Sequence, residues 1–258
     1  MATYLDRILE HHRELAGSDH RSIDEMTTEA MQMPAARGFG AALRGQSTLV
    51  VISEIKRRSP SKGDLCIDLD PANLARAYEA GGASCLSVLT DGPHFAGSIA
   101  DLQAARNACS LPVLRKDFTV SERDVIDARL MGADCVLLIA AALDASELRA
   151  FHDLATSVGL DVLVEIHDET ELDAAVAAGA SIIGVNQRDL VTFSVDHDRA
   201  VRMAALIPPD VVRVAESGVR NHADARTLRR AGYDAVLVGE SLVTAADPAA
   251  AIADLRVA

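Results

Sequence analysis

The sequence predicts an α/β protein in which eight parallel strands close into a (β/α)₈ barrel. Two observations carry this prediction. Eight short apolar segments recur along the chain, and a segment with the apolar periodicity of an amphipathic helix follows each of them. Polar residues also stand repeatedly at the carboxyl ends of the apolar segments. Strands this apolar suit a parallel sheet covered by helices, and eight units favour a closed barrel over an open doubly wound sheet.

The elements are expected in a regular order along the chain. The predicted strands are 49–56, 85–91, 112–118, 134–140, 161–168, 181–187, 211–217 and 235–239. The predicted helices are 71–81, 98–109, 121–132, 144–158, 169–179, 196–207, 221–231 and 247–256. Two pairs, Ser121 with Asp124 and Asp144 with Glu147, resemble patterns that cap a helix N-terminus. Four glycines stand where helices should end: Gly132, Gly159, Gly179 and Gly232.

One structural domain is expected overall. Residues 1–48 precede the first strand and form a helical extension, with helices at 4–15 and 39–44, that serves as a lid or plug outside the barrel. Residues 49–258 form the barrel itself. No linker or low-complexity tract suggests a second domain.

Composition excludes several classes of function. A formal net charge of −13 argues against a general nucleic-acid or anionic-membrane surface, so an anionic ligand needs a local basic pocket. No apolar run is long enough to span a membrane, and residues 1–20 are too charged for a signal peptide. These features predict a cytoplasmic protein.

The cysteines and histidines predict neither disulfides nor a metal site. No CxxC pair occurs, and Cys85 and Cys135 lie in apolar runs, which favours free thiols. The histidines have no metal-ligand spacing, and His11 and His12 are expected to be solvated positions of a helix. We expect neither a metal nor a cofactor.

The polar residues at the strand ends are candidates for a shared site, because the carboxyl ends of barrel strands converge on one mouth. They are Glu54, Lys56, Asp91, Lys116, Glu165, Asn186, Glu216, Ser217, Gly239 and Glu240. The alternative is that each is a turn residue that closes its strand. That alternative is accepted for Asp91, but a common cause explains the set better.

Acid–base chemistry is the natural use of two lysines and two glutamates at one mouth. Lys56 and Lys116 would face Glu54 and Glu165 there. A lysine among positive neighbours and apolar walls has a pKa lowered toward neutrality, which makes it a useful general acid. Salt bridges that hold the barrel closed are the alternative. The addition of Asn186 at another strand end favours a reaction centre.

A phosphate site is predicted from three turns. The first strand leads into the segment 53–63, whose hydroxyls and glycine suit an anion, and Ser59 lies within it. The segments 215–219 and 238–241 place a glycine after each of the last two strands, where barrels commonly bind phosphate. For each turn taken alone, the simpler explanation is that glycine only permits a tight turn.

A pocket for a ligand ring is a further possibility. Aromatic residues make up 3% of the chain, with no tryptophan, so each phenylalanine is informative. The candidates are Phe95 and Phe118, with Pro60, Leu137 and Leu190. Spacing alone explains them equally well as core residues. Arg188 would either grip a carboxylate or pair with Asp189.

The same residues resemble a known family. The segment 52–61, Ile-Ser-Glu-Ile-Lys-Arg-Arg-Ser-Pro-Ser, is similar to the signature of the indole-3-glycerol-phosphate synthases, ring-closing enzymes of tryptophan biosynthesis. The similarity continues through 95–98, 114–118, 164–166, 184–190, 214–219 and 238–242. It covers nearly the whole chain from about residue 4. The chain departs from some members after the fourth strand, where it has Ile-Ala-Ala-Ala, and at Glu240, where some have a small hydroxyl residue.

The resemblance implies a lyase that closes, decarboxylates and dehydrates 1-(2-carboxyphenylamino)-1-deoxyribulose 5-phosphate. It implies that Lys116 is the general acid on the substrate carbonyl and that Glu165 assists proton transfer in the dehydration. Glu54 would position groups and exchange protons. Lys56 would bind substrate and is the other candidate for the acid. Two further residues would orient the reacting groups: Asn186 and Ser217.

The resemblance also implies a set of substrate contacts, with Glu216 at the same mouth. The phosphate would be bound by Ser59, Gly218, Gly239 and, through its backbone amide, Glu240. Arg188 would bind the carboxylate. The ring would lie among Phe95, Phe118, Pro60, Leu137 and Leu190. A small phosphorylated substrate is the only expected partner, with no nucleic acid or membrane, and the protein is expected to be a monomer or weak homodimer.

Two other functions stay open at this point. Another barrel enzyme of phosphosugars, such as a phosphoribosylanthranilate isomerase, needs one acid–base pair and leaves Lys56, Glu54 and Arg188 without clear tasks. A paralogue that binds the ligand without catalysis is the second alternative. The intact set of lysines, Glu165 and Asn186 argues against it.

Overall fold

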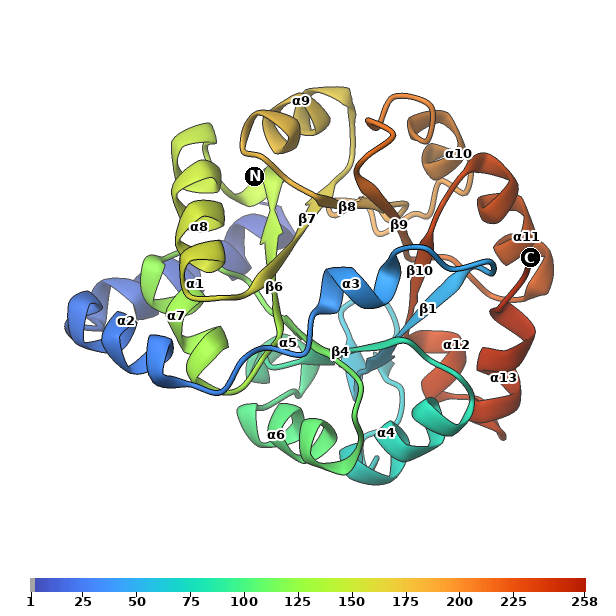
Figure 1. Ribbon diagram of the computed structural model, residues 1–258, viewed down its shortest axis with the longest axis horizontal. Helices are drawn as coiled ribbons and strands as arrows, with labels where there is room; N and C mark the ends of the chain where they lie inside the picture. The colour runs from blue at the N-terminus through green and yellow to red at the C-terminus, as the bar shows by residue number, and fades with distance from the viewer. Residues whose placement is uncertain (1–2) are drawn as a thin grey trace.

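The computed structural model describes residues 3–258, and in it eight parallel strands form a closed barrel (Figure 1). The strands are β1 (Val50–Ile55), β4 (Cys85–Leu89), β5 (Val113–Lys116), β6 (Cys135–Ile139), β7 (Asp161–Ile166), β8 (Ile182–Asn186), β9 (Val212–Glu216) and β10 (Ala235–Val238). Each strand pairs with the next along the chain. The barrel closes where β1 pairs with β10, with Val50 opposite Ala235. The predicted (β/α)₈ barrel is confirmed.

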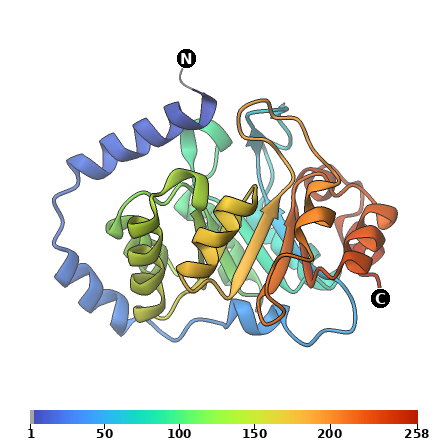
Figure 2. The same cartoon turned by 90° about the horizontal axis from the view of Figure 1, so that it is seen from above.

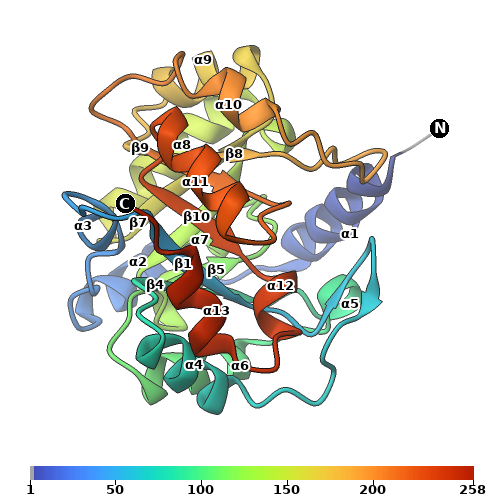
Figure 3. The same ribbon diagram turned by 90° about the vertical axis from the view of Figure 1, so that its right-hand side faces the viewer.

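The helices that follow the strands cover the outside of the barrel. They are α4 (Pro71–Ala80), α6 (Ile99–Ala108), α7 (Glu122–Leu130), α8 (Ala145–Ser157), α9 (Glu169–Ala177), α10 (Arg199–Met203), α11 (His222–Ala231) and α13 (Pro248–Leu255). Figure 3 shows α4, α11 and α13 on one side of the barrel. Asp144 and Glu147 form the predicted capping box of α8, and Ser121 accepts from the Asp124 backbone N–H at α7. The glycines predicted to end helices all have positive φ.

One predicted helix is much shorter than expected. The periodicity predicts a helix over 196–207, but α10 has only five residues. Two contacts hold the preceding loop against the end of β8. Val195 forms an isolated antiparallel β-bridge with Arg188. The Asp196 N–H donates to the Gln187 carbonyl at 2.8 Å. The chain therefore turns into a helix only after residue 198.

Several short elements were not predicted. They are α2 (Ile23–Gln32), the hairpin of β2 (Arg58–Ser59) and β3 (Gly63–Asp64), α5 (Gly92–Phe95), the 3₁₀ turn η1 (Ala140–Ala142) and α12 (Glu240–Val243). Most have four residues or fewer, which is too short for a periodic pattern to identify.

The N-terminal extension reaches both ends of the barrel (Figure 2). Helix α1 (Tyr4–Ser18) lies on the mouth side, where Arg13 donates to the Ala142 carbonyl and to Glu147. Helix α3 (Phe39–Leu43) lies at the opposite end, and its Phe39 and Leu43 pack among the inward residues at the bottoms of the strands. The extension thus contacts the barrel at both ends, and α3 plugs the end opposite the mouth.

A period of two along each strand places the polar residues inside the barrel. On β1, Val50 and Ile52 belong to the inner apolar cluster, so Glu54 continues the inward face, while Val51 and Ile55 belong to the outer cluster under the helices. The same alternation sets the inward position at the top of the other strands: Lys116 above Leu114, Glu165 above Leu163, Asn186 above Ile182, and Glu216 above Val214. The apolar interior therefore ends in a charged layer.

Four cysteines are free thiols, and Cys85 and Cys135 are buried as predicted. In residues 3–258, none of the helices has the length and apolar character needed to span a membrane.

Phe39→Ala should lower the free energy of unfolding by about 3–5 kcal/mol, because the side chain is fully buried in the plug and its loss leaves a cavity. Denaturant unfolding measures the change. Leu15→Ala, at an exposed position of α1, is the matched control and should stay within about 0.5 kcal/mol of wild type. Equal losses in the two variants would contradict the plug.

Candidate active site

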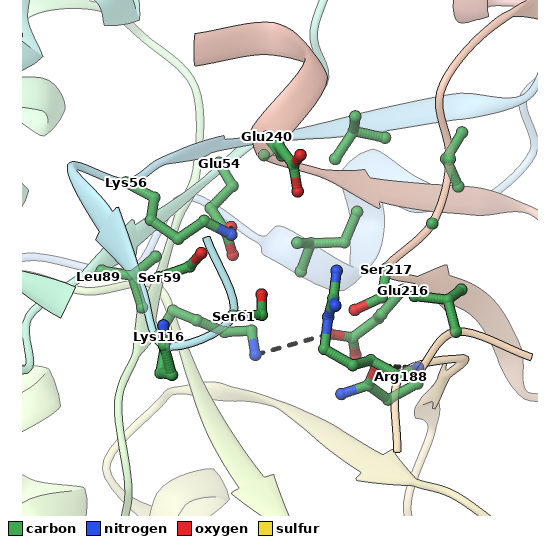
Figure 4. Close-up of a pocket in the computed structure, with 18 of the residues that line it drawn as sticks. Glu54, Lys56, Ser59, Ser61, Leu89, Lys116, Arg188, Glu216, Ser217 and Glu240 are labelled. Carbon is green, nitrogen blue, oxygen red and sulfur yellow. Dashed lines mark hydrogen bonds and ion pairs between the residues drawn. The ribbon is translucent and has the colours of Figure 1, made fainter. Parts of the chain in front are cut away.

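A cavity of about 570 Å³ opens at the carboxyl ends of the strands (Figure 4). Its wall includes every side chain predicted for the site: Glu54, Lys56, Ser59, Pro60, Phe95, Lys116, Phe118, Leu137, Glu165, Asn186, Arg188, Leu190, Glu216, Ser217, Gly218, Gly239 and Glu240. The floor is apolar, because Leu137, Ile139 and Leu237 come from the inner cluster. The structure thus brings together groups separated by almost two hundred residues in the chain.

Lys116 is the centre of the charged layer. Its Nζ donates to Glu165 Oε2 at 3.0 Å and lies 3.7 Å from Glu216 Oε2. The lysine side chain is 16% exposed, whereas the two glutamates are 2% and 3% exposed. One ammonium thus faces two carboxyl groups at the boundary between the dry barrel and the open pocket.

The charges in this layer shift three pKa values. Burial alone would lower the pKa of Lys116, but the carboxylates of Glu165, Glu216 and Glu54 outweigh it and raise that pKa above its ordinary range. A lowered lysine pKa requires positive neighbours, whereas the neighbours of Lys116 are the glutamates at the same mouth, which oppose that shift. Burial would likewise raise the pKa of Glu165, but the Lys116 charge, His167 and the Asn186 hydrogen bond lower it to about 2.

Glu216 differs from Glu165 although both contact the same lysine. Burial and the Glu165 charge raise the pKa of Glu216 to about 8, and Lys116 offsets this only in part. Its Oε1 is buried and has no hydrogen-bond partner among residues 3–258. The surroundings thus shift the two carboxyl groups in opposite directions, with the pKa of Glu165 lowered and that of Glu216 raised, a separation typical of acid–base sites.

Sequence reasoning assigned Glu216 only a binding contact. Gly184, the one glycine within β8, is a sequence signal that the Glu216 side chain lies close to this strand at the reaction centre. A Cβ atom at residue 184 would collide with Glu216 Oε1. Glycine inside a strand often marks the close approach of another group, here a carboxyl group held over the backbone.

The second lysine forms its own pair on β1. Lys56 Nζ donates to Glu54 Oε1, and the two residues share a face because they are two apart in an extended segment. A Cβ at Gly239 would collide with this carboxylate. Gly239 therefore provides the room in which the pair lies, besides permitting the turn into α12.

Asn186 and Ser217 border the reaction centre in different ways. Asn186 donates through Nδ2 to Glu165 Oε1 at 2.9 Å and accepts the Arg188 N–H at 3.0 Å. This fixes the amide and the second oxygen of Glu165. Ser217 has a φ of 64°, a left-handed conformation that costs energy for a residue with a side chain, and its carbonyl accepts from Gln187 Nε2 at 2.7 Å.

The rim near β1, β9 and β10 has features that suit an anion. The Ser59 hydroxyl is buried and lacks a hydrogen-bond partner within the described residues, so it has a free donor toward the pocket. Gly218 and Gly239 line the pocket nearby. The Glu240 carboxylate lies 3.5 Å from Lys62 Nζ on the β2–β3 hairpin, so its charge is partly neutralised.

Another part of the wall is aromatic and apolar. The ring centroids of Phe95 and Phe118 are 6.3 Å apart, and Pro60 and Leu190 line the same pocket, whose floor includes Leu137. Arg188 donates to the Phe193 carbonyl at 3.0 Å and makes no ion pair with Asp189 in residues 3–258. Asp189 instead accepts the N–H groups of Val191 and Thr192. The predicted alternative of an Arg188–Asp189 pair is wrong, and the rest of the guanidinium faces the pocket.

His12 is not a solvated helix position, in contrast to the prediction. Its Nε2 lies 3.1 Å from Asp91 Oδ2, its side chain is 13% exposed, and its ring lies 5.4 Å from that of Phe118. Asp91 is the N-cap of α5, consistent with its assignment as a turn residue. His12 thereby connects α1 to the aromatic wall.

The described residues contain one group of side chains with metal-ligand geometry, formed by His12, Asp91 and Asp117. Both carboxylates already have partners. Asp91 accepts two backbone N–H groups of α5 and contacts His94, and Asp117 accepts from Arg115, Thr90 and the Phe118 N–H. The group is better explained as a hydrogen-bonded anchor than as a metal centre.

Solved structures of low sequence identity share this fold. A 3-hexulose-6-phosphate synthase superposes with a TM-score of 0.63 at 19% identity, over 80% of this chain and 98% of that one. The thiamine phosphate pyrophosphorylase of Pyrococcus furiosus gives 0.59 at 17% identity, over 80% and 93% of the chains. These similarities support the barrel and nothing further.

Sequence relatives are much closer. The model of the family described as indole-3-glycerol phosphate synthase matches residues 5–255. The indole-3-glycerol phosphate synthase of Mycolicibacterium vanbaalenii is 51% identical over 98% of this chain and 94% of the relative. That of Streptomyces griseus is 53% identical over 91% of this chain and 87% of the relative. The chain belongs to the indole-3-glycerol phosphate synthase family.

Proposed function

We propose that the protein converts 1-(2-carboxyphenylamino)-1-deoxyribulose 5-phosphate into indole-3-glycerol phosphate, as a carboxy-lyase of tryptophan biosynthesis. The observation that carries the proposal is the position of the Lys116 ammonium, 3.0 Å from Glu165 and 3.7 Å from Glu216, two buried glutamates above an apolar floor. The pocket also offers a region for each part of this substrate: an aromatic wall for the ring, Arg188 for the carboxylate, and the free Ser59 hydroxyl for the phosphate.

Ring closure needs an acid at the substrate ketone. As the ring carbon attacks, charge develops on the ketone oxygen, and Lys116 transfers a proton to it, so that the new C–C bond leaves a hydroxyl group. The ring is then cationic. Its carboxylate leaves as carbon dioxide, and the electron pair of the broken C–C bond restores aromaticity. This step uses the substrate's own charge.

Dehydration needs one acid and one base. The hydroxyl leaves as water after it takes a proton, and the adjacent ring C–H then loses a proton to form the indole double bond. Glu216 is protonated near neutral pH and suits the first transfer, whereas the Glu165 carboxylate suits the second. Glu54 and Lys56 form a further pair for proton exchange and substrate binding.

Lys116→Met should abolish most activity, because no acid would remain at the ketone oxygen. We expect kcat to fall by at least about 10²-fold, within the range of a positioned general acid. Incubation with the carboxyphenylamino substrate, followed by indole fluorescence, measures it. Arg149→Met, at an exposed position of α8, is the control. No product from the wild type would end the proposal, and activity that persists in Lys116→Met would move the acid role to Lys56.

Ser59→Ala should weaken binding of the phosphate and leave the chemistry intact. Loss of a hydrogen bond to a charged group costs about 1.5–3 kcal/mol, so KM and the inhibition constant of inorganic phosphate should rise about 10- to 100-fold at nearly constant kcat. The hydroxyl has no partner in residues 3–258, so thermal stability should not fall. Ser157→Ala on α8 is the control. An unchanged inhibition constant would place the phosphate elsewhere.

A further inference from the structure

We propose that His167 is a positioning residue for the reaction: its imidazolium, held by Glu171, lies behind Glu165 and keeps that carboxylate ionised and oriented through the proton transfers. The inference rests on the proposed function, because Glu165 is the base in that function. His167 itself does not line the pocket and has no contact with the substrate region.

Helix α9 fixes the orientation of the His167 ring. His167 follows β7 directly, and its Nδ1 lies 3.0 Å from Glu171 Oε2, which also accepts the His167 backbone N–H at 2.7 Å. Glu171 is held in turn by its own N–H, which donates to the N-cap Asp168 at 2.9 Å. The ring is therefore clamped at one nitrogen by the first turn of the helix.

The other ring nitrogen faces the catalytic carboxylate. His167 Nε2 is buried, has no hydrogen-bond partner in residues 3–258, and lies 3.7 Å from Glu165 Oε1. The same oxygen accepts from Asn186, and the other oxygen accepts from Lys116. Glu165 thus lies between two cationic side chains, one in the pocket and one behind it. A contact of this length in the free protein is close enough to tighten when substrate binds.

The charges around His167 favour its cation. Burial alone would lower the pKa of His167, but the hydrogen bond to Glu171 and the charge of Glu165 outweigh it, while Arg199 on α10 opposes them weakly. The net effect raises the pKa. The imidazolium is therefore present below this raised pKa and is lost as the pH rises through it. The effect on Glu165 is the reverse, since a nearby cation lowers the pKa of a carboxyl group.

The reaction makes a second cation necessary. When Lys116 gives its proton to the substrate, Glu165 loses its nearest positive partner. A buried carboxylate beside a neutral amine would tend to take up a proton early. His167 stays charged through this step, so Glu165 remains ready to accept the later proton.

Two substitutions distinguish this role from a purely structural one, in which His167 only anchors helix α9. In His167→Gln, kcat should fall about tenfold, a part of the ~10²- to 10⁴-fold that a positioned proton-transfer group contributes, while KM changes by less than about twofold. The acidic limb of the kcat–pH profile should move to higher pH, because Glu165 loses a cation that lowers its pKa. His222→Gln, an exposed histidine on α11, is the matched control.

Glu171→Gln keeps an oxygen that can accept from the ring but removes the charge that holds its proton. In wild type, imidazole NMR should show His167 titrating at higher pH than the ordinary histidine value of about 6.5. Glu171→Gln should lower the His167 pKa in this titration and lower kcat at pH values where the ring has lost its proton. Glu169→Gln makes the same charge change in the first turn of α9, at an exposed residue outside this contact, and should alter neither.

The outcomes distinguish the inference from the proposed function. A His167→Gln variant with lower thermal stability but wild-type kcat and pH profile would overturn the inference and leave His167 as a helix anchor. A His167 ring that titrates at or below the ordinary histidine value of about 6.5 would also overturn it. If the wild-type protein forms no indole product, the proposed function fails separately, and the NMR titration still decides whether His167 is held as a cation.

Discussion

The contact of one lysine with two glutamates at the top of an apolar barrel is the constraint on which the site depends. Lys116 can neutralise one buried carboxylate, and a second charge beside it is too costly in so dry a place. The pKa of Glu216 is therefore raised, which favours its protonated form, while that of Glu165 is lowered, which favours its carboxylate. An acid, a base and an ammonium group thus arise from three ordinary side chains, and the difference between the two glutamates comes from their surroundings.

The barrel supplies both the dryness and the geometry of this contact. The period of two along each strand stacks an apolar residue beneath every charged one, so the charged layer has a floor that excludes water. Two glycines make the layer possible, because Gly184 and Gly239 leave room for the carboxyl groups of Glu216 and Glu54. The plug helix α3 closes the far end of the same interior.

Elements outside the barrel hold the pocket from behind. The first turn of α9 orients His167 toward Glu165, and α1 carries His12 to Asp91 and to the ring of Phe118. In each case a helix cap or a helix face fixes a histidine, and the histidine contacts a group at the pocket wall. The pocket is therefore supported by residues that never touch its interior.

Local patterns in the sequence determined the order of strands and helices, the capping of α7 and α8, and the convergence of polar strand ends on one mouth. These features depend on periods of two and 3.6 residues and on turn chemistry, which are short-range. Only the tertiary structure decided which individual groups make contact. Lys116 contacts Glu216 as well as the expected Glu165, Arg188 donates to the Phe193 carbonyl and not to its neighbour Asp189, and His12 is held by a residue far along the chain. Spacing along the sequence does not give the distances between charged groups in the fold, and pKa shifts depend steeply on those distances.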